Sequence, residues 1–305
     1  MSDGRARRLA ARLHDGARSW LATQPLAVVD EEWRVISWRN PRNPGYAYPE
    51  AGGMWLSFAL ESDFPTDTMR QVARWLANVG SAAGLIGRNG IDYTFDTAIV
   101  ARGLLRFAER TGDAELEARA IAYRDKARRE FRNRRAAVGE GTLEDRWSVR
   151  FGAHLKKTDA ILQQLGSGGR SAVFPDPFLE STPYTHAAAY YLEGCALAGE
   201  WDPVTRGAIK LARLQAANGG LCAEPGSTTT RSDATAQAVR LWTLSDRRQY
   251  AGELEGALSF LEQCQTVSGG IRYESESDDV NTWATIFTAQ AARWITRGPV
   301  VEHLI

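Results

Sequence analysis

The chain has 305 residues, and its 37 basic and 37 acidic side chains give a formal net charge of zero. This balance gives no electrostatic reason to expect a nucleic-acid or membrane-surface partner. No apolar run approaches the roughly 20 residues that span a bilayer, and the charged N-terminus does not resemble a secretory signal. The three cysteines, Cys195, Cys222 and Cys264, are widely separated, which fits a reduced cytoplasmic protein better than a disulfide framework.

The first fifty residues predict one helix and one hairpin. Apolar residues at Leu9, Leu13, Ala17 and Leu21 form a stripe, which predicts an amphipathic helix over 5–22. Two apolar runs that flank a short acidic turn predict a β-hairpin near residues 26–38. The Pro- and Gly-rich stretch that follows predicts a loop.

Two kinds of helix alternate along the rest of the chain. Charged amphipathic helices are expected at 5–22, 67–79, 114–135, 203–217 and 249–266. Helices that are rich in Ala, Thr and aromatic residues, and that begin with polar residues, are expected from about 52, 93, 149, 183, 232 and 280. Because the pattern repeats, we predict an all-α ring of about six helical hairpins, with the second kind of helix lining the inside. Only a loop is available at 167–182, so one outer helix is missing there.

We expect one domain over 1–305, made of an N-terminal helix and hairpin (1–50) and the helical repeats (51–298). The segments Phe95–Ala98, LQAANGGLCAEP and CQTVSGGIRYES resemble the repeats of squalene cyclases and protein prenyltransferases. In those repeats a Gln at a helix end and a Gly-Gly turn precede an Asp-Thr-Ala helix start. This α/α-toroid architecture is similar to that of the six-hairpin glycan-active enzymes, which include uronyl hydrolases, lyases and sugar epimerases. The resemblance implies an active site in the central cavity, near the starts of the inner helices, but the architecture alone does not select a reaction.

Two features differ from the isoprenoid enzymes. Class II terpenoid cyclases carry an Asp-x-Asp-Asp motif, whereas this chain has Glu276-Ser277-Asp278-Asp279. Protein prenyltransferases bind zinc through Asp, Cys and His, and no such set surrounds Cys222. The ten tryptophans could line a sugar-binding or an isoprenoid-binding cavity, although most are expected to pack in the core.

Candidate catalytic residues begin with two acids four residues apart, Asp92 and Asp96, at the start of the helix near 93. On one helix face their mutual repulsion would raise one pKa and leave an acid and a base; alternatively they are a helix cap and a structural partner. His154 lies three residues before Lys157, so a neutral His base and an anion-binding Lys could share a face, unless Lys157 is merely a surface residue.

Further polar groups open the other inner helices. Tyr184 and His186 could exchange protons with a sugar, or act as cap and aromatic plug. Arg231 could pair with Asp233, or could bind a carboxylate or phosphate. The last helix starts with the densest polar cluster, in which Asp278 and Asp279 are the candidate acids. The predicted catalytic residues are therefore Asp92, Asp96, His154, His186, Asp278 and Asp279, and the predicted substrate-binding residues are Glu50, Tyr93, Lys157, Tyr184, Arg231, Asp233, Arg272, Tyr273, Asn281 and Trp283.

We therefore expect an enzyme that acts on a saccharide or sugar-derived substrate as a hydrolase, lyase or epimerase, through carboxylate and His acid–base chemistry. Two alternatives stay open: a terpenoid-cyclase-like or prenyl-substrate enzyme with Asp278 or Asp279 as its acid, and a non-catalytic toroid binding protein. No cofactor is predicted, although a divalent metal ion could bridge Asp278 and Asp279. The expected partner is a small molecule or oligosaccharide, and the sequence leaves the oligomeric state open.

Overall fold

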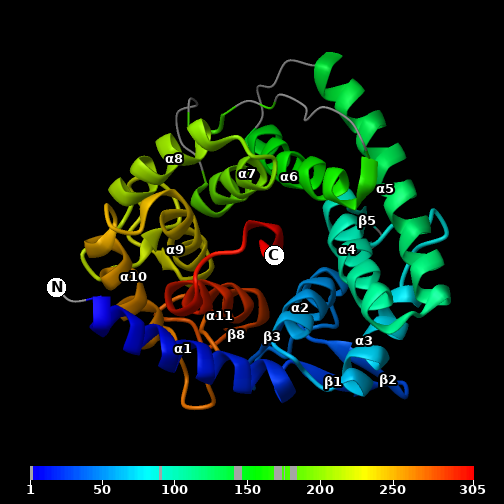
Figure 1. The fold of residues 1–305 in the computed structure, drawn as a ribbon, viewed down its shortest axis with the longest axis horizontal. Coiled ribbons are helices and arrows are strands. Elements are labelled where there is room, and N and C mark those ends of the chain that lie inside the picture. Colours follow the sequence, from blue (N-terminus) through cyan, green and yellow to red (C-terminus); the bar gives the residue numbers. More distant parts are fainter. Residues whose placement is uncertain (1–2, 89–90, 141–145, 168–173, 175, 179–183) are drawn as a thin grey trace.

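A computed structural model describes residues 3–88, 91–140, 146–167, 174, 176–178 and 184–305. Among these residues, six helices form an inner ring: α2 (Pro49–Glu61), α4 (Thr94–Thr111), α6 (Arg146–Leu162), α7 (Thr185–Leu197), α9 (Ser232–Asp246) and α11 (Thr282–Arg297). Each contacts the next, and α11 contacts α2, so the ring is closed (Figure 1). Outside it lie α1 (Asp3–Thr23), α3 (Thr66–Asn78), α5 (Ala114–Glu140), α8 (Trp201–Arg213) and α10 (Ala251–Cys264).

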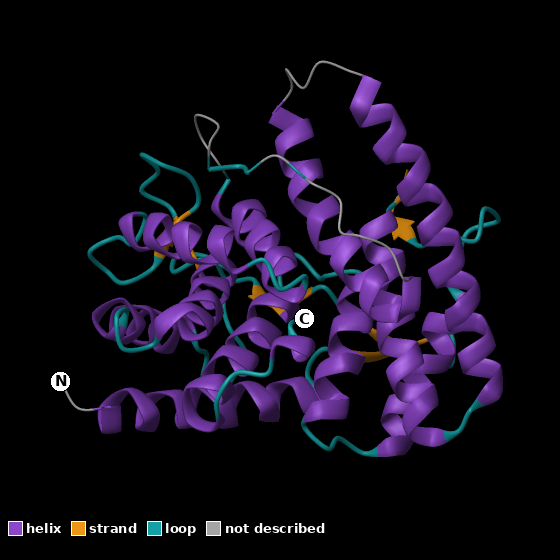
Figure 2. Cartoon of the chain, turned by 45° about the horizontal axis from the view of Figure 1, so that its top comes forward, coloured by secondary structure: helices purple, strands orange, loops and turns teal. Residues whose placement is uncertain are grey.

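Short antiparallel strand pairs join the helices, which otherwise make up the molecule (Figure 2). The expected hairpin is β1 (Leu26–Val29) paired with β2 (Glu32–Val35), in the register Leu26 to Val35. The other pairs are β3 (Trp38–Arg39) with β8 (Val280–Asn281), β4 (Gly87–Arg88) with β5 (Ile91–Asp92), and β6 (Leu221–Cys222) with β7 (Thr230–Arg231). The β3–β8 pair brings the first and last helical hairpins together, so it helps to close the ring.

The two kinds of helix expected from the sequence occupy the two layers. All residues of α2 from Glu50 to Leu60 are buried, whereas α8 buries one stripe formed by Val204, Gly207, Ala208 and Leu211. An inner helix is covered on all sides, so it lacks the polar face of an outer helix. The described residues between α6 and α7 form no outer helix, and these two inner helices pack directly on each other. Most of the loop predicted at 167–182 lies outside the described residues.

The turns that contain Gln and Gly-Gly join successive outer helices through hydrogen bonds of the Gln side chain. Nε2 of Gln215 donates to the carbonyl of Gly219 (2.9 Å) and to that of Glu253 on α10 (2.8 Å). Gln265 repeats this arrangement with Gly269 (3.0 Å) and with Leu13 on α1 (3.1 Å). At the first glycine of each turn, Gly219 or Gly269, an added Cβ would lie 2.1 Å from a carbonyl oxygen of the neighbouring helix. The φ angles there are also positive (+88° and +97°), so only glycine fits.

The Thr of the repeated helix starts has a structural role. Thr97, Thr235 and Thr285 accept backbone N–H groups from Ile86, Leu221 and Ile271 at 2.8–2.9 Å. Each also donates to the carbonyl four residues earlier, at 2.6–2.8 Å. The hydroxyl therefore ties the start of α4, α9 and α11 to the chain segment 11 to 14 residues before it, which fixes the direction in which the first turn points.

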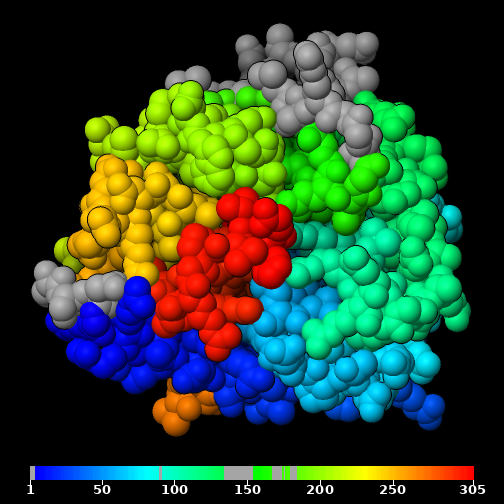
Figure 3. Space-filling model, in the orientation of Figure 1, coloured from blue at the N-terminus to red at the C-terminus, as the bar shows by residue number. Residues whose placement is uncertain are grey.

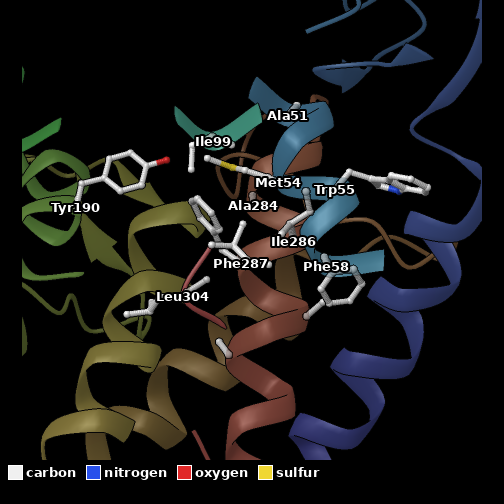
Figure 4. Close-up of a cluster of buried hydrophobic side chains, with 14 of the residues drawn as sticks. Ala51, Met54, Trp55, Phe58, Ile99, Tyr190, Ala284, Ile286, Phe287 and Leu304 are labelled. Carbon is white, nitrogen blue, oxygen red and sulfur yellow. The ribbon is translucent and has the colours of Figure 1, made fainter. Parts of the chain in front are cut away.

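The C-terminal segment closes one end of the ring. After α11 the chain turns through the short helix η2 (Val301–His303) into the centre, where Leu304 and Ile305 are buried (Figures 1 and 3). Leu304 lies with Phe287 and Tyr190 among the side chains that fill the middle of the ring (Figure 4). None of the described helices is long and apolar enough to cross a membrane.

Candidate active site

A pocket of about 370 Å³ lies where the inner helices begin. It is lined by Trp38, Tyr46, Tyr48, Glu50, Arg88, His154, Tyr184, His186, Tyr190, Arg231, Asp233, Tyr273, Asp279, Asn281 and Trp283. Four inner helices contribute the same two positions, the N-cap and the second residue: Tyr48 and Glu50, Tyr184 and His186, Arg231 and Asp233, Asn281 and Trp283. Helical side chains tilt toward the N-terminus, so first-turn residues of a ring of parallel helices converge on one end of it.

Glu50 and Asp96 form a buried acidic pair around the hydroxyl of Tyr48. This hydroxyl lies 2.9 Å from Oδ2 of Asp96 and also hydrogen-bonds Glu50. A hydroxyl donates one proton only, so all three groups are satisfied when one carboxyl group is protonated and donates to Tyr48.

Burial raises the pKa of both carboxyl groups, and the charge of Glu50 raises that of Asp96 further. Hydrogen bonds from Tyr48 and the indole of Trp283 oppose the shift of Glu50, and the pKa of Glu50 is raised to about 7. Asp96 lies behind Tyr48 and does not line the pocket, whereas Glu50 does. Glu50 is thus the member that can exchange a proton with a ligand near neutral pH.

His186 forms the second polar centre, on the side of the pocket formed by α7 and α9. Its Nδ1 lies 2.7 Å from Oε1 of Gln237 and 3.2 Å from Oδ2 of Asp233. Asp233 is also held by both ends of the Arg231 guanidinium, at 3.0 and 2.6 Å. Although burial opposes ionisation, the charges of Arg231 and His186 lower the pKa of Asp233, so Asp233 is an anion here.

Aromatic rings form the rest of the wall. Trp38, Tyr46, Tyr48 and Trp283 make a continuous series with ring centroids 5.1–5.6 Å apart. Arg88 lies over Tyr46 and Tyr48, and its guanidinium donates to the Tyr46 hydroxyl. Arg231 lies over Tyr184 and Tyr273, at 5.0 and 4.2 Å from the centroids. Rings with fixed orientation and polar edges suit the flat apolar faces and hydroxyl rims of sugars.

His154 and Lys157 lie at different levels of α6: His154 lines the pocket, and Lys157 lies below it. His154 lines the pocket, with its ring 5.0 Å from that of Tyr190. Lys157 is completely buried; its ammonium binds Glu193 at 2.7 Å and the Ile305 carbonyl at 2.8 Å, beneath the Tyr190 ring. Burial lowers the pKa of Lys157 to about 8 despite Glu193. Lys157 therefore does not line the pocket with His154, but lies in an internal ion cluster with Glu193 and Arg240.

Asp278 and Asp279 diverge from one another. Asp278 is exposed and pairs with Arg42, whereas Asp279 lines the pocket and accepts from Nδ2 of Asn40 at 2.7 Å. Adjacent residues of an extended chain point in opposite directions, so the two carboxylates do not converge. Within the described part of the chain, no three His, Cys, Asp or Glu side chains are grouped so that they could hold a metal ion.

Asp92 and Asp96 do not share a helix face, contrary to expectation. Asp92 lies in β5, before α4 begins at Thr94, and accepts from the Ser81 hydroxyl at 3.0 Å. Tyr93 is the N-cap of α4 but does not line the pocket. Arg272 also lies outside the pocket lining, and donates to the carbonyl of Gln263 at 2.6 Å.

The structure therefore gathers most of the predicted residues. Those that line the pocket are Glu50, His154, Tyr184, His186, Arg231, Asp233, Tyr273, Asp279, Asn281 and Trp283, and Asp96 reaches it through Tyr48. Sequence reasoning missed five lining residues, Trp38, Tyr46, Tyr48, Arg88 and Tyr190, and also Gln237, which contacts His186. Trp38 and Arg88 arrive on short strands whose pairing the sequence does not reveal, and Tyr190 and Gln237 read as ordinary core residues of inner helices. Tyr48 has a recognisable signal, because it takes the N-cap position before Pro49.

No protein-family model matches the chain, and no characterised protein sequence is significantly similar to it. Solved structures do match. A sugar epimerase from a ruminal bacterium has a TM-score of 0.65 at 12% identity, over 97% of this chain and 99% of that one. An unsaturated glucuronyl hydrolase specific for heparin has a TM-score of 0.61 at 11% identity, over 96% and 97%. An α-amylase from Clostridium perfringens has a TM-score of 0.59 at 11% identity, over 92% and 97%. The similarity extends along nearly the whole of each chain, and the protein therefore has the α/α-toroid fold that the repeats predict.

Proposed function

We propose that the protein is an enzyme that acts on a saccharide in this pocket by acid–base catalysis, with Glu50 as the group that gives or takes the proton. The observation that carries this proposal is a carboxyl group with a pKa of about 7 that faces a pocket walled by aromatic rings. A group that titrates near neutral pH is effective in both directions of proton transfer. Hydrolysis, elimination and epimerisation of sugars all need such a group.

The size and lining of the pocket support a small saccharide. Its volume of about 370 Å³ falls in the range of roughly 300–1,000 Å³ that is typical of small-molecule sites. Trp283 and the Tyr46–Tyr48 pair offer ring faces, and Asn281, Asp279 and Arg88 offer hydrogen-bonding groups at the edges. Proteins of the same fold include a sugar epimerase, glycosidases and a polysaccharide lyase, which agrees with this assignment.

The two alternatives have less support. A prenyl substrate calls for an apolar cavity, whereas this pocket has charged groups on several sides, and Asp278 of the proposed acid motif points away from it. A non-catalytic toroid binding protein is expected to have its central cavity filled by side chains, but here a pocket stays open above Tyr190.

The test combines binding with one substitution. Uronic acids, neutral oligosaccharides and prenyl diphosphates are screened by thermal shift, and saccharides that bind are assayed for hydrolysis, elimination and epimerisation. Glu50→Gln is expected to lower turnover by about 10²–10⁴-fold, the usual contribution of a general acid–base group, with binding retained. Glu61→Gln is the matched control, because Glu61 is a buried acid on the same helix that pairs with Arg106 outside the pocket. Stabilisation by prenyl diphosphates alone, or full activity of Glu50→Gln, would overturn the proposal.

A further inference from the structure

The described residues hydrogen-bond the imidazole of His186 at one nitrogen, Nδ1. Nδ1 faces Oε1 of Gln237 at 2.7 Å and Oδ2 of Asp233 at 3.2 Å, and both of these residues belong to α9. The ring packs against Tyr190, with centroids 4.5 Å apart. The side chain is 17% exposed and lines the pocket. No described residue hydrogen-bonds Nε2, so this nitrogen is left for a ligand.

The orientation of the Gln237 amide follows from the ions beneath it. Nε2 of Gln237 lies 3.4 Å from Oε2 of Glu193, whose carboxylate binds Lys157 at 2.7 Å and also pairs with Arg240. A carboxylate accepts hydrogen bonds and does not donate them, so the NH₂ group of Gln237 must face Glu193. The carbonyl oxygen of the same amide must then face His186.

Both neighbours of Nδ1 are therefore acceptors. Oε1 of Gln237 has no proton to give, and Asp233 is held as an anion by the two contacts from Arg231. Two acceptors can be satisfied only if Nδ1 carries the hydrogen. In the neutral ring the lone pair then lies on Nε2.

We infer that Gln237 is a positioning residue which, with Asp233, holds His186 as the Nδ1–H tautomer, so that Nε2 accepts a proton from the bound ligand. The role toward substrate rests on the proposed function; the tautomer does not. In the proton transfer, a substrate O–H or C–H proton passes to Nε2 and its electron pair stays on the substrate. The imidazolium that forms keeps its contact with Asp233, while Glu50 gives its own proton to a substrate oxygen.

The ring order places these two groups on opposite walls. Counting around the inner ring from α2, which carries Glu50, α7 is the fourth of six helices and carries His186 (Figure 1). A proton donor and a proton acceptor that face each other across a ligand can act in one step, without a proton passing between them through the protein.

The first measurement needs no substrate. The protein is labelled with ¹⁵N at histidine, and His186 is assigned by comparison with His186→Gln. At a pH where the ring is neutral we expect Nδ1 to show the shift of a protonated nitrogen and Nε2 that of an unprotonated one. The opposite pattern, or rapid averaging of the two nitrogens, would overturn the inference.

The second measurement isolates Gln237. Gln237→Met keeps the side-chain volume and removes the acceptor, so the Nε2–H tautomer should become populated. Turnover should fall about tenfold, while KM for the saccharide changes less than twofold. Gln290→Met is the matched control, because Gln290 is an equally buried amide that binds Arg240 and the His303 carbonyl but not His186. It should leave the His186 nitrogen shifts unchanged; equal effects of both variants would overturn the role of Gln237.

The two proposals fail separately. An Nδ1–H tautomer in a protein that binds no saccharide would contradict the proposed function and leave the positioning of His186 in place. Saccharide turnover by a protein whose His186 is in the Nε2–H form would contradict the positioning of His186 and leave the proposed function in place.

Discussion

Glu50 and His186 occupy the same helical position, the second residue, in two inner helices that stand opposite each other across the ring. The surroundings make them different. Burial raises the pKa of Glu50 to about 7, so it holds a proton that it can release. His186 lines the pocket and is held through Nδ1 by Asp233 and Gln237, and no described residue hydrogen-bonds its other nitrogen. One repeated backbone position thus carries a carboxyl group on one wall and an imidazole on the other, and these are the two groups to which we assign the proton transfer.

The protonation of Glu50 predicts a pH-dependent stability difference. Its pKa rises from 4.5 to about 7 on folding, so between these values the unfolded chain releases a proton that the folded protein keeps. Below about pH 4.5 Glu50 is protonated in both states and does not change the free energy of unfolding with pH. As the pH rises, the free energy of unfolding falls, and above pH 7 it is lower by about 3 kcal/mol. Glu50→Gln removes this loss, so relative to the natural protein the variant should be more stable at pH 8 than at pH 5.

Urea denaturation of both proteins at pH 5 and pH 8 measures this difference. Glu276→Gln, at an exposed carboxylate, serves as the control and should differ from the natural protein equally at both pH values. If Glu50→Gln behaves in the same way as Glu276→Gln, the acidic pair does not hold an additional proton.

The layers of the ring were predictable because each rests on a local pattern. Stripes of apolar residues distinguish outer helices from fully buried inner ones, and the Gln and Gly-Gly turns recur at Gln215 and Gln265 with the same bonds to the next helix. The lining positions at the starts of inner helices were predictable for the same reason. A polar residue at the start of an otherwise buried helix either caps that helix or faces a cavity. Glu50, His186 and Asp233 face the cavity.

How far below the pocket a residue of an inner helix lies was not predictable. His154 and Lys157 share a face when the helix is viewed along its axis, but Lys157 lies nearly one turn deeper, under Tyr190 and within an ion cluster. The pairing of strands far apart in the chain was also not predictable from the sequence. Trp38 of β3 pairs with Asn281 of β8, some 240 residues later, and this pairing places both residues in the pocket lining. Contacts of this kind depend on the finished ring rather than on any local pattern.

Two neighbouring lysines of α6 should differ sharply in their importance for stability. Lys157 binds Glu193 where both side chains are fully buried, whereas Lys156 binds Glu200, whose side chain is 38% exposed. Removing one partner of a buried ion pair typically costs about 3–5 kcal/mol. In Lys157→Met, Arg240 still pairs with Oε1 of Glu193, but Oε2 of Glu193 and the Ile305 carbonyl lose the ammonium that binds them. Lys157→Met should therefore lower the free energy of unfolding by about that amount.

Lys156→Met is the matched control and should cost about 1 kcal/mol or less, since water can solvate Glu200. Urea denaturation at pH 7 compares the two variants. A loss for Lys157→Met no larger than that for Lys156→Met would mean that the cluster beneath the pocket does not stabilise the ring.

The contact between α2 and α4 depends on glycine. A Cβ on Gly103 would lie 2.8 Å from the carbonyl oxygen of Gly53, so Gly103→Ala must push the two helices apart. Such overpacking typically costs about 1–3 kcal/mol. Gly252 in α10 is the control: a Cβ there meets no atom within 4 Å, so Gly252→Ala should stabilise by up to about 1 kcal/mol through helix propensity. Opposite signs are expected in chemical denaturation, and destabilisation by both changes would contradict the packing argument.

The repeated threonines give a test of what holds the helix starts in place. The Thr235 hydroxyl accepts from the Leu221 N–H at 2.8 Å and donates to the Arg231 carbonyl at 2.6 Å. Thr235→Val would leave a buried N–H without a partner, which costs about 1–3 kcal/mol. Because Arg231 and Asp233 precede Thr235 in the same turn, the pocket wall should loosen as well, and saccharide binding should weaken in parallel.

Thr288 provides the matched control for this change. It is as fully buried as Thr235, but no described residue hydrogen-bonds its hydroxyl. Thr288→Val keeps the shape and removes an unpaired polar group, so the free energy of unfolding should stay within about 0.5 kcal/mol or rise. Urea denaturation of the two variants decides the point: if Thr235→Val costs no more than Thr288→Val, the helix starts are held by packing alone, and the threonine of the repeat does not orient the residues that line the pocket.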